Sequence, residues 1–514
     1  MCQNGGTCRQ MGPAAVSCIC APGYTGDLCE AQLASPECGI EECAGVCKQG
    51  TICDCNPKDT DFSSARFDTK LEVADQAGVN ISQEIVKQLT NYLKASNITL
   101  EDEVEILNIS AVGEGSAREV WVRVWGARRE AGALRAALAR MRTHHVRLRA
   151  NTLHFHMQPA LSLQTLSVNH RPEIWEGSQF ILTCMANGSP NITFTWYKDG
   201  IKINFNGTLR DIWTRTVSED ALGRRMSVLG ISEAKRPDSG KWSCAADDAG
   251  RRRCRALRLT VLRPPDIRLV PSTITVDKGD NVSITCLAGA GRVHGALGFS
   301  WARERTLLPM APGREVWEDL FPAGSVLKLY NVQKSSEFRC QVSSVAGTNA
   351  QAVTMWALGA DDVACESDVS HGLRWPKTAP GAHATASCPP GHSGETTRFC
   401  EPKTGQHGVK WMLPDFSGCV ADSLRDIYEQ FTLISLGYSW RAVSLVARQY
   451  GAVLRSLPTH PGEGEPPLTH AAHMLHYLMS AAAQPADRYH SAEHLLHIYD
   501  HLLTHPDAFL DEEV

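Results

Sequence analysis

One short motif in this chain has the residue types and spacing of a metal-dependent catalyst. His490, Glu493 and His494 stand in the order His-x-x-Glu-His, which on a helix places two imidazoles one turn apart beside a carboxylate. His497 and His501 extend the same stripe. A zinc hydrolase of this kind also takes a third ligand from a later helix, and little chain follows His494. We therefore interpret the stripe as a solvated or packed helix face, with adventitious metal binding as the alternative. We expect no enzyme and no cofactor.

Cysteines are the other reactive side chains. The chain has 19 of them, and 10 lie within the first 55 residues, a density typical of small disulfide-stapled modules in an oxidising compartment. Seven asparagines stand in Asn-x-Ser/Thr sequons, which indicates glycosylated extracellular loops: Asn80, Asn97, Asn108, Asn187, Asn191, Asn206 and Asn281. No signal peptide precedes Cys2. The sequence therefore predicts an extracellular protein whose start lies upstream of Met1.

Composition limits the class of protein. The chain has 514 residues. Because a domain usually has about 100–200 residues, this length predicts several domains. Hydrophobic residues at 43% and charged residues at 21% are near globular averages. The net charge of −5 argues against a nucleic-acid partner. The sequence has no apolar stretch of about 18 or more residues to cross a bilayer, no nucleophile elbow and no phosphate-binding glycine loop, so it favours binding over turnover.

The first two modules are cysteine-rich. Residues 1–30 combine a Cys2-Gln-Asn-Gly-Gly-Thr-Cys8 stretch, Cys18-Ile-Cys20 and a Pro-Gly-Tyr-Thr-Gly-Asp-Leu-Cys29 ending, and they resemble an EGF-like module. The resemblance implies the bridges Cys2–Cys18 and Cys20–Cys29 and leaves Cys8 without its partner. Residues 31–61 hold Cys38, Cys43, Cys47, Cys53 and Cys55. We interpret them as a degenerate second module of the same kind with its pairing open, since their spacing lacks the knuckles of a zinc site.

Residues 62–160 contain no cysteine and need an ordinary core. Periodicity predicts strands at Phe67–Val73, Val104–Ile109, Val120–Val124 and Leu153–His156, and helices at Ser82–Lys94 and Ala131–Met141. This β-α-β-β-α-β order is that of a small α+β sandwich, and together with the sequons it resembles a SEA domain. The resemblance implies self-cleavage at Gly115-Ser116 by an N-to-O acyl shift. Because Ala117-Arg118-Glu119 follow where the family has a run of Val-like residues, we expect an ordinary, largely uncut turn.

Two segments have the Cys…Trp…Cys spacing of immunoglobulin β-sandwiches. Residues 161–263 place Trp196 between Cys184 and Cys244, and Asp238-Ser-Gly-Lys-Trp242-Ser-Cys244 resembles the family's corner motif with Trp in place of Tyr. Residues 264–358 place Trp301 between Cys286 and Cys340. The resemblance implies the inter-sheet bridges Cys184–Cys244 and Cys286–Cys340. Cys254 is left over in the last strand of the first sandwich.

The last two modules differ in cysteine content. Residues 359–420 contain Cys365, Trp375-Pro376, Cys388-Pro-Pro-Gly391, Arg398-Phe-Cys400, Trp411 and Cys419, and they resemble a hormone-receptor motif domain. The resemblance implies the bridges Cys365–Cys400 and Cys388–Cys419 with Trp375 and Trp411 buried.

Residues 421–514 have no cysteine and show helical periodicity at Leu424–Leu436, Ala442–Leu454, His470–Ala483 and Ser491–Leu503, with a loop at Pro458–Pro467. They resemble the helical half of a GAIN domain. We expect Leu436, Val443, Leu475 and Leu495 to be exposed without the other half.

The order of these modules resembles the extracellular region of an adhesion G-protein-coupled receptor, most like subfamily F. That resemblance implies a plasma-membrane protein whose extracellular side binds a protein or matrix ligand, and which reaches a G protein only through a membrane portion beyond this chain. The alternative is a secreted matrix or decoy protein with the same modules. Basic runs at Arg251-Arg252-Arg253-Cys254-Arg255 and within 118–149 could bind glycosaminoglycan, although strand alternation would split the first run between two faces.

Overall fold

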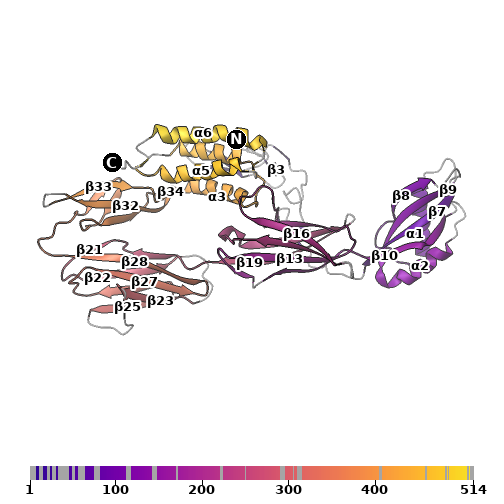
Figure 1. Ribbon diagram of the computed structural model, residues 1–514, viewed down its shortest axis with the longest axis horizontal. Helices are drawn as coiled ribbons and strands as arrows, with labels where there is room; N and C mark the ends of the chain where they lie inside the picture. The colour runs from indigo at the N-terminus through magenta and orange to yellow at the C-terminus, as the bar shows by residue number, and fades with distance from the viewer. Residues whose placement is uncertain are drawn as a thin grey trace.

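A computed structural model describes most of the chain as a series of separate folded modules (Figure 1). The described residues are 7–10, 16–19, 24–25, 31–32, 46–48, 52–55, 64–74, 81–111, 117–141, 148–169, 172–219, 224–248, 251–289, 296–304, 306–308, 315–403, 408–457, 460–480, 483, 485–505 and 509. Before Cys55 the description is of backbone alone. There the chain forms antiparallel strand pairs, namely β1 (Thr7–Gln10) with β2 (Val16–Ile19), β3 (Tyr24–Thr25) with β4 (Ala31–Gln32), and β5 (Val46–Lys48) with β6 (Ile52–Asp54).

The cysteine-free segment folds into an α+β module. Its elements are β7 (Ser64–Ala74), α1 (Ile81–Ala95), β8 (Glu105–Ala111), β9 (Ala117–Ala127), a short 3-10 turn at Arg128–Glu130, α2 (Ala131–Arg140) and β10 (Leu148–Pro159). The strands form one antiparallel sheet in the order β10-β7-β9-β8. Apolar residues of the sheet pack against Ile85 and Leu89 of α1 and Leu134 of α2, so the helical periodicity of the sequence sets the packing face.

The next two modules are two-sheet β-sandwiches. The first sandwich has the sheets β11-β13-β17-β16 and β12-β19-β18-β14-β15. The second sandwich has the sheets β20-β22-β26-β25 and β21-β28-β27-β23-β24. Buried residues alternate with half-buried residues along β13 and with exposed residues along β27, so that one face of each strand is turned into the core. Each core holds a tryptophan whose indole N–H reaches a serine hydroxyl, Trp196 to Ser227 at 3.0 Å and Trp301 to Ser325 at 2.9 Å.

The strands of the sandwiches have these bounds. The first comprises β11 (Ser162–Val168), β12 (Glu173–Trp175), β13 (Phe180–Asn187), β14 (Thr193–Lys198), β15 (Ile201–Lys202), β16 (Ile212–Glu219), β17 (Arg224–Ile231), a 3-10 turn at Arg236–Asp238, β18 (Gly240–Asp248) and β19 (Arg251–Leu262). The second comprises β20 (Ile267–Val270), β21 (Ile274–Asp277), β22 (Val282–Ala288), β23 (Gly298–Arg303), β24 (Thr306–Leu307), β25 (Val316–Phe321), β26 (Gly324–Leu329), β27 (Ser336–Ser344) and β28 (Gly347–Leu358).

A small cysteine module follows the second sandwich. Its strands are β29 (Asp368–Ser370), β30 (Leu373–Trp375), β31 (His383–Ser387), β32 (His392–Pro402), β33 (Val409–Asp415) and β34 (Cys419–Ala421). Trp375 is 1% exposed, as expected. Trp411, which the sequence predicted to be buried, is only half-buried. Its indole N–H donates to the carbonyl of Glu366 at 2.9 Å, so the ring lies over the module edge and covers Arg398.

The chain ends in a helical module with its own core. It consists of α3 (Asp422–Ser435), α4 (Val443–Leu454), α5 (Glu465–Met479) and α6 (Pro485–Thr504). The predicted loop at Pro458–Pro467 is too long, because α5 already begins at Glu465. Pro466 and Pro467 lie in its first turn, where the missing N–H groups cost no helical hydrogen bond.

The expected exposure of the helical module was largely wrong. Val443 and Leu495 are 1% and 2% exposed because the helices bury them against one another. Leu436 is 3% exposed because it packs into the core of the first sandwich. Only Leu475, at 38%, is exposed as expected. The helices are thus a folded unit with apolar sides turned inward.

The chain doubles back along its long axis. The two sandwiches follow one another, and the cysteine module and the helices return beside them, so that α3 reaches the first sandwich (Figure 1). The α+β module lies at the far end of the first sandwich (Figure 1). Within the described ranges, no helix is both long enough and apolar enough to cross a bilayer.

Candidate functional site: the domain junctions

The histidine motif lies on α6 beside α4. His490 and Glu493 are exposed and His494 is half-buried, and a shallow hollow between the helices is lined by both histidines and Arg448. Burial lowers the pKa of His494 below its ordinary value, and the positive charge of Arg448 acts in the same direction. Over the part of the chain that the structure describes, no three His, Cys, Asp or Glu side chains are grouped so that they could hold a metal ion. A guanidinium lining the hollow also disfavours a cation there.

Several predicted site residues lie outside the described residues. Gly115 and Ser116 fall between β8 and β9, so the expectation of an uncut turn stays a prediction. The backbone pairing of β1 with β2 places Cys8 opposite Cys18. The sulfur atoms of Cys2, Cys8, Cys18, Cys20 and Cys29, and those of Cys38, Cys43, Cys47 and Cys53, are beyond the side-chain description.

Four disulfides join cysteines of the same module, and each has the partners that the family resemblances implied. Cys184 is bonded to Cys244, Cys286 to Cys340, Cys365 to Cys400 and Cys388 to Cys419. The first two join the sheets of their sandwiches. The other two brace the cysteine module, in which Cys400 and Cys419 are 0% and 1% exposed.

A further disulfide joins Cys55 to Cys254 across 199 residues. Cys254, which the sequence left without a partner, is 1% exposed on β19 and packs with Tyr197 and Ala245, and Cys55 covers this small cluster. Cys55 therefore does not form a disulfide within a second EGF-like module. The sign in the sequence was an odd number of cysteines in residues 31–61 and in residues 161–263. Nothing in the cysteine spacing linked the two unpaired cysteines to each other.

We expect a non-reducing peptide map to find Cys55 linked to Cys254. In Cys55→Ser the unit formed by the α+β module and the first sandwich should lose about 2–4 kcal/mol of stability. The freed Cys254 thiol should react with a thiol reagent only after denaturation, because it stays buried. A Cys254 peptide linked to any other cysteine would contradict this pairing.

The α+β module is joined to the first sandwich by charged and aromatic contacts. Arg251 lies over the ring of Trp125, with its guanidinium carbon 3.6 Å from the centroid, and forms an ion pair with Asp102 at 2.5 Å. Arg66 pairs with the buried Asp248 at 3.7 Å.

Two further arginines of the basic run on β19 have partners within the first sandwich. Arg252 lies 3.7 Å from Asp247, and Arg255 donates to the carbonyl of Leu163 at 2.9 Å. The basic run on β19 thus has partners inside the protein, which argues against it as a glycosaminoglycan site.

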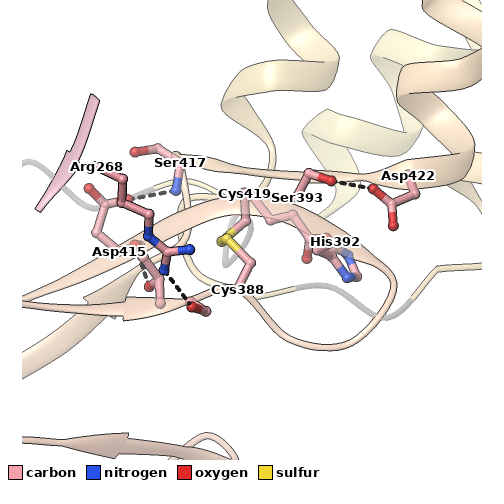
Figure 2. The surroundings of a disulfide bond; sticks show 11 residues. Arg268, Cys388, His392, Ser393, Asp415, Ser417, Cys419 and Asp422 are labelled. Atoms are coloured by element: carbon pink, nitrogen blue, oxygen red, sulfur yellow. Dashed lines mark hydrogen bonds and ion pairs between the residues drawn. A yellow bond between two sulfur atoms is a disulfide. The ribbon is translucent and has the colours of Figure 1, made fainter. Parts of the chain in front are cut away.

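The cysteine module is the junction between the second sandwich and the helices, as Figure 2 shows around Cys388 and Cys419. Arg268 of β20 approaches Glu395 of β32 at 3.4 Å. The ammonium group of Lys377 donates to Asp277 at 3.0 Å, and the Thr273 hydroxyl donates to the carbonyl of His383 at 2.7 Å. These contacts hold the cysteine module along the edge of the second sandwich.

The opposite side of the cysteine module holds the first helix. Ser393 is hydrogen-bonded to Asp422 at the start of α3 (Figure 2). The Asp422 N–H also donates to the carbonyl of Gly391 at 2.9 Å. His392 Nε2 lies 2.7 Å from Glu463 Oε1. Because Cys419 precedes α3 by only a few residues, the Cys388–Cys419 bridge fixes where the helix starts.

Five of the predicted glycosylation sites have exposed side chains: Asn97, Asn108, Asn191, Asn206 and Asn281. Asn187 is half-buried and Asn80 lies outside the described residues. The exposed asparagines meet the steric requirement for a glycan.

His470 titrates inside the helical module. Its ring stacks on Tyr428 with centroids 3.7 Å apart, and the Tyr450 hydroxyl lies 2.8 Å from its Nδ1. Burial, with a smaller effect of His473, lowers the pKa of His470 from 6.5 to about 4. Burial also lowers the pKa of His501. Neutral His470 is therefore the form that the fold accommodates.

We expect the helical module to lose stability as the pH falls from about 6.5 to about 4. In that window the unfolded chain binds a proton at His470 and the folded chain does not. The loss should be about 1–2 kcal/mol, since partial exposure screens the charge. Denaturation followed by circular dichroism at several pH values measures it. His470→Phe should reduce this pH dependence, leaving the smaller contributions of His494 and His501, and His476→Phe, an exposed control on α5, should not change it. Equal slopes in both variants would contradict the assignment to His470.

Comparison with known proteins supports two kinds of module. Residues 160–247 match the immunoglobulin domain family and residues 2–28 match the EGF-like domain family. Hemicentin-1 of Mus musculus is 26% identical over 38% of this chain and 3% of its own length. Receptor-type tyrosine-protein phosphatase F of Danio rerio is 28% identical over 32% of this chain and 8% of its own length. Peroxidasin homolog pxn-1 of Caenorhabditis elegans is 25% identical over 42% of this chain and 16% of its own length.

Among solved structures, the titin domains I67–I69 have 16% sequence identity and a TM-score of 0.28, covering 44% of this chain and 72% of that one. The chain spans at most 16% of the length of the three relatives named above. The matches to the phosphatase and the peroxidasin homologue lie in the immunoglobulin regions, and they indicate no enzyme activity. The matches show an EGF-like domain and an immunoglobulin domain, which are typical of extracellular proteins.

Proposed function

We propose that this chain is the ligand-engaging extracellular part of an adhesion G-protein-coupled receptor of subfamily F, with the third member of that subfamily as our choice. The proposal assigns the α+β module to the SEA domains, the cysteine module to the hormone-receptor motif domains and the helices to the first half of a GAIN domain. It places the protein at the plasma membrane with these modules outside the cell. A soluble fragment would be secreted.

The observation that carries the proposal is the junction around Cys388–Cys419. A small module braced by crossed disulfides passes directly into α3, without a linker, and shares hydrogen bonds with the helices. A second observation is that α5 and α6 carry exposed large apolar side chains: Met479, Leu496 and Leu503 are 76%, 68% and 78% exposed. Exposed large apolar side chains of this kind suit a further module packed on the same helices.

In this proposal the mechanism is mechanical. The EGF-like and immunoglobulin modules bind a protein or matrix ligand on another surface, and displacement of the helical module exposes a tethered peptide agonist beyond this chain. The membrane portion then couples to a G protein. No residue of this chain performs a chemical step, apart from Ser116 if the bond after Gly115 is cleaved.

The test is the coding sequence downstream of Val514 together with the location of the full-length product. A receptor continues into a self-cleavage site and seven apolar helices of about 20 residues each, and surface biotinylation recovers it from intact cells. The alternative is a secreted matrix or decoy protein. A stop codon without apolar helices, with the product in the medium, would establish that alternative and overturn the receptor assignment.

A further inference from the structure

The segment between α3 and α4 leaves the helical module and lies along an edge of the first sandwich. The N–H of Leu209 donates to the carbonyl of Ser435 and the N–H of Asn204 donates to the carbonyl of Gly437, each at 2.9 Å. Thr208 and Leu436 pair as in an antiparallel bridge. Gly437 has a φ of 77°, and a Cβ there would lie 2.6 Å from the carbonyl oxygen of Asn204, so only glycine allows this approach.

Tyr438 inserts into a socket of the first sandwich. Its side chain is 2% exposed, and its ring meets Trp242 edge-on with centroids 5.8 Å apart. The Arg210 guanidinium lies 4.9 Å from the ring centroid, and the Tyr438 hydroxyl donates to the carboxylate of Asp238. Burial and the charge of Asp238 raise the pKa of Tyr438, so the hydroxyl stays a donor. The socket therefore recognises both the ring and the hydroxyl.

Without Tyr438 the socket loses the hydrogen bond from Arg210 Nη2 to the Tyr438 hydroxyl, but Asp238 keeps its other partners. Both oxygens of Asp238 accept from Arg210 Nη1 at 2.9 Å, and one also accepts from the Lys235 N–H at 2.7 Å. Trp242 donates its indole N–H to the carbonyl of Asp238 at 2.9 Å. Withdrawal of Tyr438 therefore leaves no buried charge without a partner, which is the usual cost of removing one member of a buried network.

The helical module is equally independent of this contact. Its core is built by residues of α3, α4, α5 and α6, and neither Leu436 nor Tyr438 belongs to it. Two contacts flank the socket: the indole N–H of Trp440 donates to the carbonyl of Lys202 at 2.8 Å, and the Tyr477 hydroxyl donates to the carbonyl of Gly207 at 3.3 Å. Residues 435–440 thus bind the first sandwich as a peptide ligand binds a sheet edge, with backbone bonds and two anchoring side chains, Leu436 and Tyr438.

We propose that residues 435–440 are an internal ligand of the first sandwich, and that they act as a releasable clamp. The sandwiches, the cysteine module and the helical module are in contact in succession, and this clamp closes them into a ring. Release opens the ring and uncovers the edge 201–209 with its socket. The occupant is the segment of the same chain, because the cysteine-module junctions already bring α3 to the first sandwich. The inference is independent of which full-length protein carries the modules.

Hydrogen exchange of the full chain, read by mass spectrometry, tests the clamp. In Tyr438→Ala the amides of residues 202–210 should exchange about 100-fold faster, the scale of losing a buried aromatic anchor. Peptides of β13, β18 and the second sandwich should be unchanged. The matched control is Tyr489→Ala on α6, where the side chain is 82% exposed, and it should leave residues 202–210 protected.

A second variant separates release from unfolding. Trp440 is 56% exposed at the rim, so Trp440→Ala should speed exchange of the same peptide to a smaller extent and leave both modules folded. X-ray scattering should show a larger radius of gyration in both variants. Unchanged exchange in Tyr438→Ala, or faster exchange throughout the first sandwich, would overturn the clamp. A dimer held by the same contact, seen by light scattering, would show that a second copy is the occupant and overturn the intramolecular assignment.

Discussion

Trp242→Ala is expected to lower the free energy of unfolding of the first sandwich by about 3–5 kcal/mol. The side chain is fully buried and packs edge-on against Phe180, with centroids 5.7 Å apart, and against Tyr438 on its other side. Its indole N–H closes the turn before β18 by donating to Asp238. The truncation therefore removes core volume, a buried hydrogen bond and the floor of the Tyr438 socket together.

Domain-resolved hydrogen exchange or pulse proteolysis measures this effect, since unfolding of a chain with several modules is not two-state. Trp242→Tyr should cost less, about 1–2 kcal/mol, because a phenol can keep a donor near Asp238. Trp317→Ala on β25 of the second sandwich is the matched control: that ring is 45% exposed, and the change should stay within about 1 kcal/mol. If Trp242→Ala were no more destabilising than Trp317→Ala, the corner would not support the first sandwich.

Local patterns predicted the elements and the short-range bridges. Alternation along Phe67–Val73 and Val120–Val124 indicated the strands that become β7 and β9, and helical periodicity indicated α1, α3 and α4, because burial of one face fixes both patterns. The helix at Ala131–Met141 was likewise found at Ala131–Arg140. The inter-sheet bridges Cys184–Cys244 and Cys286–Cys340 each lie within one module, so the resemblance to immunoglobulin domains was enough to imply them.

Contacts between modules left no local signal. Cys55 and Cys254 are 199 residues apart, and Tyr438 and Asp238 are 200 apart. Leu436 was expected to be exposed at the end of a helical pattern, and no pattern singled out Tyr438, because the burial of both comes from another module. For the contact of Leu436 and Tyr438 with the first sandwich, the sign in the sequence was Gly437, since a glycine after a helix indicates either a helix cap or a close approach of two backbones.

Arg398 forms the centre of the cysteine module. Its side chain is 9% exposed, and the guanidinium carbon lies 5.7 Å from the ring centroid of Trp375 and 4.9 Å from that of Trp411. Nε donates to the carbonyl of Met412 at 2.8 Å and Nη1 donates to Asp368 at 2.6 Å. The hydrogen bond from Arg398 is the main cause of the lowered pKa of Asp368. A module this small has few apolar side chains to bury, so the stacked cation replaces part of a hydrophobic core.

We therefore expect Arg398→Ala to cost the cysteine module about 3 kcal/mol. Arg398→Lys should restore only part of this, because an ammonium group keeps the charge but can neither stack between two indoles nor donate through a planar fork. Arg374→Ala, at an exposed position of β30, is the matched control and should have no measurable effect. Hydrogen exchange of β31 and β33 with both disulfides intact reports the change. Since α3 starts beside Cys419, the amide of Asp422 should also lose protection in Arg398→Ala. Full protection of β33 in Arg398→Ala would show that the two disulfides alone hold the module.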